Sequence, residues 1–251
     1  MSMVHFISPQ TRKRVLELAQ SDNLHVLLLG DSGTGKGAIA KWIHAHSPRS
    51  LKPFVVAKPD QDLFTLFQEA QGGSIYFPEI AQWPQGIQKR LAHYIQKRTL
   101  EHNGVQSLFQ VRLLAASDES LANRVQAGLF HADLYNALIQ QVLTMPPLED
   151  RKEELDDIAT GLLSEMDSEA TLSPEALKLL HAYSWPGNLR ELRNVLRFAL
   201  QNFLQKNTDP NQEKLLKADD FPKLGEMSAQ FKASREAFEK WLSSQDAKKL
   251  T

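Results

Sequence analysis

A glycine-rich segment that ends in lysine has the residue types and spacing best suited to chemistry in this sequence. It reads Gly30-Asp31-Ser32-Gly33-Thr34-Gly35-Lys36 and is followed by Gly37. Glycines let a backbone fold closely around phosphate oxygens, while successive amides and the start of a helix supply partial positive charge. The ammonium group of Lys36 would reach the terminal phosphates. The segment therefore predicts a phosphate loop in which residues 30–37 hold a nucleotide.

Gly37 departs from the pattern that such loops usually follow. Many phosphate loops have Ser or Thr at this position, and its hydroxyl group binds magnesium. Glycine offers no such ligand, so we expect Mg²⁺ binding to be weak or absent. A simpler interpretation is a glycine-rich turn in which Lys36 is a surface residue. The elements around the segment favour the phosphate loop.

Short apolar runs alternate with helical patterns in the first part of the chain. The runs cover residues 25–29, 53–56, 74–77, 111–115 and 141–145. Such runs are typical of strands buried on both faces, as in a parallel sheet covered by crossover helices. The glycine-rich segment lies between the first run and a helix predicted over residues 38–46, as a phosphate loop requires. We predict an α/β nucleotide-binding subdomain over residues 1–148.

The pattern changes after Pro146-Pro147, where helical stretches follow one another without a strand. They begin near residue 152, at Ser173-Pro174, and after Trp185; Ser173 is a helix cap followed by proline at the first helical position. We predict a three-helix lid over residues 149–205. Residues 206–251 are predicted to form a polar loop and an amphipathic helix over 231–250. No DNA-binding unit is expected in this last segment.

The composition excludes several classes of protein. The chain has 251 residues, a formal net charge of -1 and no cysteine. Disulfides and thiolate-ligated zinc are therefore excluded, and the charge does not favour an autonomous nucleic-acid binder. No window approaches the roughly 18 apolar residues of a membrane span, and the first residues lack a secretory signal. We expect a cytoplasmic protein that contacts no membrane and does not bind DNA directly.

Several further segments, in chain order, resemble the AAA+ domain of bacterial enhancer-binding proteins, the ATPases that remodel sigma-54 RNA polymerase. The glycine-rich segment is similar to the family's Walker A motif, and residues 72–80 to its Walker B strand. The other similar segments are the sensor I region (residues 111–121), the arginine-finger region (128–135), the start of the lid (146–148) and the sensor II motif (183–192). The resemblance covers about residues 6–205. It implies an α/β wedge with a helical lid that binds ATP or ADP.

The resemblance also shows which parts of the family's hydrolytic machinery differ. The family's Walker B Asp-Glu pair, which holds magnesium and orients water, reads Pro78-Glu79 here. The arginine fingers correspond to His131 and Ala137, and neither side chain substitutes well for arginine. The lid arginine is retained as Arg190, which the resemblance places on a bound phosphate. Three other positions also depart from the family pattern: Lys58, Ser117 and Asp118.

Simple structural roles remain open for several of these residues. Glu79 can be a solvated carboxylate at a strand end, His131 a residue of a helix surface, and Arg190 a partner of Glu191 or another lid carboxylate. Trp185-Pro186-Gly187 is interpreted as a packing and turn device.

The family's sigma-54 contact is also missing from the sequence. The family inserts a helix-loop-helix with a Gly-Ala-Phe-Thr-Gly-Ala loop between the second and third strands. Here residues 55–71 fill that space and have room for one short crossover helix. We therefore expect no sigma-54 contact, and self-association or binding to a related AAA+ regulator instead.

Three hypotheses remain at this point. The first is a degenerate regulatory domain that binds nucleotide without appreciable hydrolysis, with Glu79 at most a residual catalytic group. The second is a working ATPase and sigma-54 activator in which other residues replace the lost ones. The third is an interaction scaffold that does not depend on ATP, whose pocket is empty, locked with ADP or specific for another nucleotide.

Overall fold

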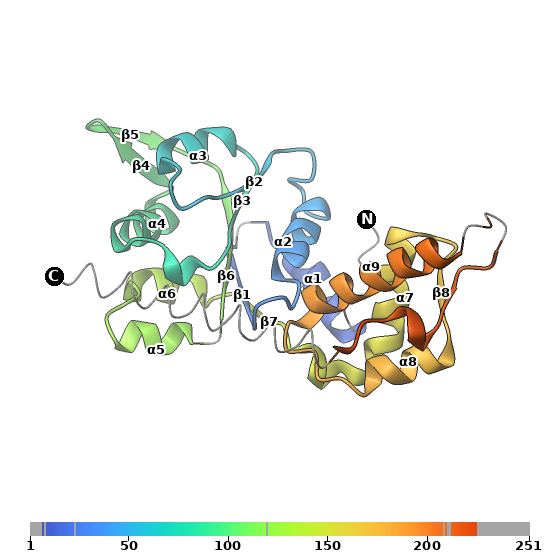
Figure 1. The fold of residues 1–251 in the computed structure, drawn as a ribbon. Helices are drawn as coiled ribbons and strands as arrows, with labels where there is room; N and C mark the ends of the chain where they lie inside the picture. The colour runs from blue at the N-terminus through green and yellow to red at the C-terminus, as the bar shows by residue number, and fades with distance from the viewer. Residues whose placement is uncertain are drawn as a thin grey trace. The chain divides into compact units, whose positions relative to one another are not determined.

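The computed structural model describes residues 7–224 except 8, 23, 119, 208, 210 and 211 (Figure 1). The described residues form two compact units, which divide between Pro147 and Leu148. The helix predicted over residues 231–250 lies outside the described residues. Within the described part of the chain, no helix has both the length and the apolar character needed to cross a bilayer.

The first unit is built on a five-stranded parallel sheet. Its strands are β1 (Val26–Leu29), β2 (Phe54–Val56), β3 (Ser74–Phe77), β6 (Arg112–Ser117) and β7 (Val142–Thr144), in the spatial order β2-β3-β6-β1-β7. Every neighbouring pair is parallel. The predicted α/β sheet is thus confirmed. Because the strands run in one direction, their carboxyl ends share one edge, where ligands of such sheets bind.

Helices cover both faces of this sheet (Figure 1). The helices α1 (Pro9–Gln20) and α2 (Lys36–Ala45) lie on one face. The helices α3 (Leu63–Glu69), α4 (Gln85–Lys97), α5 (Leu121–Gln126) and α6 (Ala132–Leu138) lie on the other. Successive side chains of β3 alternate accordingly, because Ile75 and Phe77 join the core under α3 to α6, whereas Tyr76 faces α2.

The connection between β2 and β3 contains one short helix, as predicted. This helix is α3, and Asp62 caps it by accepting a hydrogen bond from the Thr65 N–H at 2.8 Å. A side-chain acceptor at this position satisfies one of the amides that a helix start leaves without a partner. The connection has no second helix and no extended loop in the described residues.

A two-stranded hairpin after α4 was not predicted. The strand β4 (Thr99–His102) pairs antiparallel with β5 (Val105–Leu108). Asn103 and Gly104 form the turn with φ of 51° and 77°, and Asn-Gly is the strongest short-range hairpin signal in a sequence. Glu101, His102 and Gln106 make both strands polar, so this pair lacks the apolar runs that mark the strands of the central sheet.

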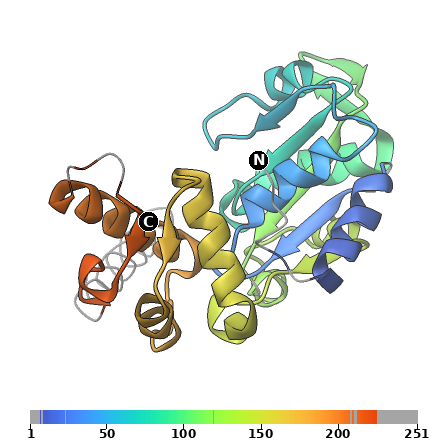
Figure 2. The ribbon, with the colours of Figure 1, turned by 90° about the vertical axis from the view of Figure 1, so that its right-hand side faces the viewer.

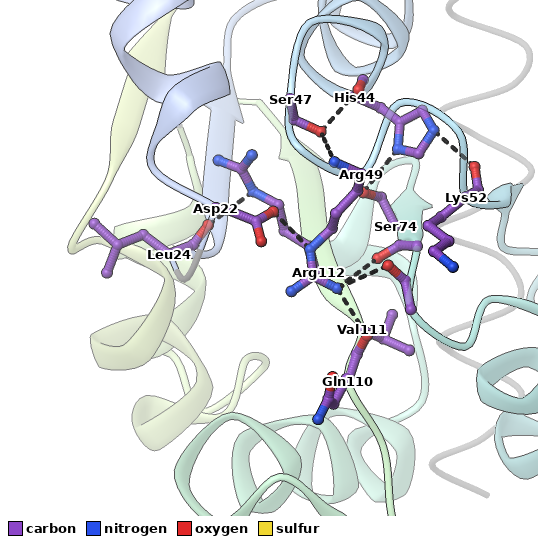
Figure 3. Close-up of polar contacts among 12 residues, drawn as sticks. Asp22, Leu24, His44, Ser47, Arg49, Lys52, Ser74, Gln110, Val111 and Arg112 are labelled. Atoms are coloured by element: carbon purple, nitrogen blue, oxygen red, sulfur yellow. Dashed lines mark hydrogen bonds and ion pairs between the residues drawn. The ribbon is translucent and has the colours of Figure 1, made fainter.

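Arg49 ties the end of α2 to the amino edge of the sheet (Figure 3). Its Nε donates to the Asp22 carboxylate at 2.6 Å. Its Nη1 donates to the carbonyl oxygens of Gly72, Gly73 and Gln110 at 3.1, 3.3 and 2.8 Å. Hydrogen bonds from a charged donor are stronger than neutral ones. Arg49 therefore holds the segments that enter β3 and β6 against the turn that follows α2.

Arg112 performs a similar role for α1 at the same edge (Figure 3). Its side chain is 1% exposed and donates to the carbonyl oxygens of Leu18, Ala19 and Leu24 at 2.6, 3.2 and 2.9 Å. Figure 3 shows the bond to Leu24. The last carbonyls of a helix lack partners within the helix and carry partial negative charge. Burial lowers the pKa of Arg112 to about 10. The guanidinium therefore remains charged at neutral pH and caps α1.

His25 is buried next to these arginines. Its Nδ1 accepts a hydrogen bond from the Leu113 N–H at 2.9 Å, and its Nε2 lies 2.9 Å from Nη1 of Arg98. A proton added to either ring nitrogen would therefore face a hydrogen-bond donor. Burial, and then the charges of Arg98 and Arg112, lowers the pKa of His25 to about 3. The imidazole is therefore neutral at physiological pH.

The second unit is helical (Figure 2). A 3-10 helix, η3 (Leu148–Glu154), leads into α7 (Leu155–Met166), which is followed by α8 (Pro174–His181) and α9 (Asn188–Lys206). Ser173 caps α8 as predicted, because its Oγ accepts a hydrogen bond from the Ala176 N–H at 3.2 Å.

The helical unit continues past residue 205. The strand β9 (Leu215–Leu216) pairs with β8 (Thr171–Leu172). The Asn202 amide on α9 donates to Asp220 O, in the 3-10 helix η4 (Ala218–Asp220), at 3.0 Å. The structure therefore places residues 212–224 with the lid, whereas the sequence suggested a linker-like segment after residue 205.

The turn between α8 and α9 is built from buried side chains of the sensor II-like motif. Trp185 is 1% exposed, and its Nε1 donates to Leu180 O at 2.9 Å. The buried Glu191 carboxylate accepts hydrogen bonds from Tyr183 Oη at 2.9 Å and from the Gly187 N–H at 2.8 Å. A buried carboxylate needs such donors. Trp185 and Glu191 thus shape the turn that precedes Arg190.

Gly73 provides a test of the packing between β2 and β3. A Cβ added to Gly73 would lie 1.9 Å from Pro53 O, which already accepts a hydrogen bond from the Ser74 N–H at 2.9 Å. We expect Gly73→Ala to lower the free energy of unfolding by about 3 kcal/mol, because the two strands must move apart. Urea denaturation measures this difference.

Gly86→Ala is the matched control. A Cβ on Gly86 would meet no atom within 4 Å, and alanine stabilises a helix such as α4 by about 1 kcal/mol relative to glycine. If Gly73→Ala and Gly86→Ala unfold at the same urea concentration, the described contact between Gly73 and Pro53 is wrong.

His25 makes stability depend on pH. Its pKa is lower in the folded than in the unfolded protein, so the unfolded state binds the proton more readily. The contribution of neutral His25 is complete above about pH 6.5 and declines as the pH falls toward 3. We expect wild type to lose about 1.4 kcal/mol per pH unit between pH 6 and pH 4 beyond the loss in His25→Asn. Asn keeps an acceptor for the Leu113 amide but does not titrate. Denaturant titrations at each pH measure the free energy of unfolding of both proteins. If the free energies of wild type and His25→Asn fall in parallel between pH 6 and pH 4, the prediction is wrong.

Candidate nucleotide-binding site

The loop of residues 30–35 leaves the carboxyl end of β1 and leads directly into α2. Gly33 and Gly35 have φ of 84° and 98°, values that other residues rarely adopt. A Cβ on Gly30 would lie 2.4 Å from Met145 O, so glycine is required there as well. The first amides of α2 have no partner within the helix and carry the positive end of its dipole. This end of the sheet is therefore suited to bind an anion.

Lys36 is the first residue of α2, and its ammonium group lies inside the loop. Nζ donates to Gly30 O at 2.6 Å and to Asp31 O at 3.0 Å. The side chain is 5% exposed, and a buried charge requires such partners. The carbonyl groups of the loop thus fix the ammonium group at the position where a phosphate would meet it.

The other predicted loop residues divide into two groups. Thr34 is buried, and its Oγ1 donates to Asp31 O at 2.9 Å, which closes the loop on itself. The side chains of Asp31 and Ser32 are exposed, and so is Gly37. The structure therefore brings residues 30–37 together as one loop. Thr34 and Lys36 are buried in it, whereas Asp31, Ser32 and Gly37 are exposed.

Glu79 lies beside this loop. Its Oε1 is 3.5 Å from Lys36 Nζ, and its side chain is 40% exposed. Glu79 has a left-handed backbone conformation, with φ 45° and ψ 58°, directly after Pro78 at the end of β3. Such a conformation is uncommon for a residue with a side chain. The Pro78 carbonyl accepts a hydrogen bond from Trp83 Nε1 at 3.2 Å. The strand end is thus a defined turn that brings the Glu79 carboxylate to the ammonium group.

Tyr76 is a residue of this site that the sequence analysis missed. A Cβ on Gly37 would lie 3.4 Å from Tyr76 Cε1 and 3.5 Å from Tyr76 Oη. The tyrosine is 8% exposed. Burial, and then the charge of Glu79, raises the pKa of its phenol above the ordinary value. The alternation of side chains along β3 could have placed Tyr76 on the α2 face, but not directly over Gly37.

Two positions near the loop lack a side-chain oxygen that could bind magnesium. Gly37 stands where many phosphate loops have a Ser or Thr hydroxyl group, Pro78 stands where the resemblance places a metal-binding Asp, and neither has a side-chain oxygen. Tyr76 approaches the space beside Gly37 instead. Among the described residues, no three His, Cys, Asp or Glu side chains are grouped as metal ligands. Glu79 faces Lys36 from the end of β3.

The sensor I segment also reaches this edge of the sheet. Ser117 ends β6, and its carbonyl accepts a hydrogen bond from the Gly30 N–H at 3.2 Å. Its Oγ is buried and has no hydrogen-bond partner among the described residues. Asp118 bonds locally, because its Oδ1 accepts a hydrogen bond from the Ser120 N–H at 3.0 Å. Ser117 therefore adjoins the loop through its main chain.

The positions of the family's arginine fingers lie at α6. His131 precedes the helix, its N–H donates to Gln88 Oε1 at 2.8 Å, and its ring is partly buried rather than on an open surface. Ala137 lines a pocket of about 400 Å³ together with His25 and Arg98. Lys58 is exposed in the segment after β2.

Arg190 belongs to the second unit. It lies in the first turn of α9, and its side chain is exposed. The neighbouring Glu191 points into the unit and bonds to Tyr183 and Gly187.

Comparisons with known proteins agree with this geometry. Residues 8–148 match the model of the sigma-54 interaction domain, and residues 149–236 match that of an AAA+ ATPase lid domain. The chain is 35% identical over 223 residues to the response regulator protein FleR of Pseudomonas aeruginosa, and the match covers 77% of this chain and 47% of FleR. It is also 35% identical over 205 residues to the regulatory protein AtoC of Escherichia coli, and this match covers 70% of this chain and 44% of AtoC.

A similar crystal structure is that of NtrX from Brucella abortus in complex with ADP. The TM-score is 0.71 at 26% sequence identity, and the match covers 92% of this chain and 59% of the NtrX chain. NtrX has also been crystallised in complex with ATP. The present chain spans about half the length of the curated relatives that it matches. By sequence and by fold, it belongs to the sigma-54 interaction domain family, the AAA+ domains of bacterial transcriptional regulators.

Proposed function

We propose that this AAA+ domain binds ATP or ADP through residues 30–37 and hydrolyses ATP very slowly or not at all. The observation that carries the proposal is the pairing of an intact phosphate loop with a strand end that has Pro78 in place of a metal-binding carboxylate. Such a domain would act as a regulatory module whose state depends on nucleotide rather than as a motor.

The binding half of the proposal is supported by the loop itself. The amino end of α2, the glycine backbone and the fixed Lys36 ammonium group all favour a polyphosphate. The related NtrX domain has been crystallised with both ADP and ATP. Arg190 is proposed as a further phosphate contact, by analogy with the lid arginine of the family.

The loss of hydrolysis is supported by three differences in the catalytic residues. Phosphoryl transfer to water requires a metal clamp on the phosphates, a carboxylate that orients water, and positive charge on the transition state. Pro78 cannot bind metal. The ion pair between Glu79 and Lys36 competes with any role of the carboxylate in orienting water. Ala137 and His131 replace arginine fingers, which contribute about 10³ to 10⁵ in rate.

The partner is proposed from what the chain between β2 and β3 contains. The only helix described there is the seven-residue α3, and the sequence has no Gly-Ala-Phe-Thr-Gly-Ala motif. We therefore propose that the domain acts by assembly with itself or with a related AAA+ regulator, without contact to sigma-54 and without binding DNA itself.

Two other functions have some support. The position of Glu79 at the loop favours a residual ATPase. The hydrogen bonds from Lys36 to the loop carbonyls favour a scaffold that does not need nucleotide, because they satisfy the ammonium group in the protein alone. Measurements of binding and of turnover distinguish these functions from the proposed one.

Removal of the lysine tests the binding half. We expect Lys36→Ala to weaken ATP and ADP binding by at least about tenfold, because a hydrogen bond to a charged group contributes about 1.5–3 kcal/mol. Isothermal titration calorimetry measures both affinities. Lys41→Ala is the matched control, because Lys41 lies on the same helix with an exposed side chain. Equal affinities for the two variants would refute phosphate binding at this loop.

Removal of the carboxylate tests the hydrolytic half. We expect wild type, Glu79→Ala and the control Glu69→Ala to release phosphate from ATP at the same background rate, since the metal ligand and the fingers are missing. Glu69 lies on α3 with an exposed side chain. A turnover that disappears in Glu79→Ala and persists in Glu69→Ala would show an active ATPase.

A further inference from the structure

Tyr76 lies where a phosphate loop ordinarily has its magnesium-binding hydroxyl group. In many such loops the residue after the lysine is Ser or Thr, and its hydroxyl binds the metal. Here that residue is Gly37, and a Cβ built on it would be 3.5 Å from Tyr76 Oη. A hydroxyl group is therefore present beside this position, but it comes from β3 instead of α2.

Tyr76 and Gly37 fit each other sterically. A Cβ at residue 37 would also be 3.4 Å from Tyr76 Cε1, which is an ordinary van der Waals distance. The ring therefore lies directly beside the position that a side chain of residue 37 would take. The tyrosine hydroxyl is thus next to the position at which a Ser or Thr would carry its own hydroxyl group.

The chemistry of the phenol suits a neutral hydrogen-bond donor. Its burial and the nearby Glu79 carboxylate both disfavour the phenolate, so the proton is retained at neutral pH. The side chain is 8% exposed, and no described residue accepts a hydrogen bond from its Oη. This Oη is not among the buried polar atoms that lack a partner, so it reaches solvent and is accessible to a ligand. A phosphate oxygen is an acceptor that matches both the neutral donor and the adjacent Lys36.

We propose that Tyr76 Oη donates a hydrogen bond to a phosphate of the bound nucleotide, and that this domain binds ATP and ADP without a divalent cation. The proposal rests on nucleotide binding at residues 30–37. Lys36, the amides at the start of α2 and the Tyr76 hydroxyl together supply the positive charge and the donors that a metal supplies in other phosphate loops. A phenol provides no negative oxygen to compensate a metal ion, and Pro78 provides none either.

The test compares nucleotide affinities with EDTA and with excess magnesium. We expect wild type to bind ADP and ATP at least as tightly in EDTA as in magnesium. We expect Tyr76→Phe to bind about tenfold more weakly than wild type in EDTA, because it loses one hydrogen bond to a charged group. Tyr135→Phe is the matched control, because Tyr135 lies on α6, on the opposite face of the sheet. Calorimetry with each purified protein provides the affinities, and thermal unfolding without nucleotide checks that each variant is folded.

The outcomes separate this inference from the proposed function. If wild type binds nucleotide in neither buffer, or if Lys36→Ala binds as well as wild type, the proposed function itself fails. If wild type binds only with magnesium, or if folded Tyr76→Phe binds as tightly as wild type in EDTA, the inference about Tyr76 is overturned and the proposed function stands. If Tyr76→Phe does not fold, the comparison of wild type in the two buffers still decides whether a metal is required.

Discussion

The candidate site depends on a lysine ammonium group that is held by backbone carbonyls. Lys36 is buried, so its charge requires fixed partners, and the carbonyls of Gly30 and Asp31 supply them. This arrangement requires a tight loop between the carboxyl end of β1 and the first turn of α2. Glycine meets that requirement, because the loop includes backbone conformations and a close approach to Met145 that other residues would not tolerate. Glu79 then completes the charge balance from β3.

The two edges of the sheet have different roles. At the amino edge, Arg49 and Arg112 bind the carbonyls of the segments that enter the strands and of the end of α1. These charge-assisted bonds fix the helices to the sheet at the end remote from the loop. At the carboxyl edge, polar groups from three strand ends meet without a comparable network. The amino edge therefore supports the position of α2, while the carboxyl edge remains open to a ligand.

The departures from the family's pattern are physically connected in this fold. Pro78 stands in place of a carboxylate, and Glu79, the residue after it, has a left-handed backbone conformation and meets Lys36. Gly37 has no side-chain oxygen, and the Tyr76 ring lies beside it. The result is a phosphate loop surrounded by an ammonium group, a phenol and one carboxylate. Such a set of groups suits the binding of a polyphosphate.

The sequence by itself determined the five strands, the phosphate loop, the short α3 and the cap of α8, because each depends on local patterns of apolar residues, glycine, proline and capping side chains. Asn103-Gly104 is also a local signal for the hairpin, although its polar strands lack the apolar runs of the central sheet. Only the tertiary structure decided that Tyr76 covers Gly37, that Glu79 meets Lys36 and that Glu191 is buried beneath the sensor II turn. Two of those contacts join residues that lie far apart along the chain, and no local pattern pairs them. All three depend on how the strands and helices pack, which the periodicity of apolar residues does not specify.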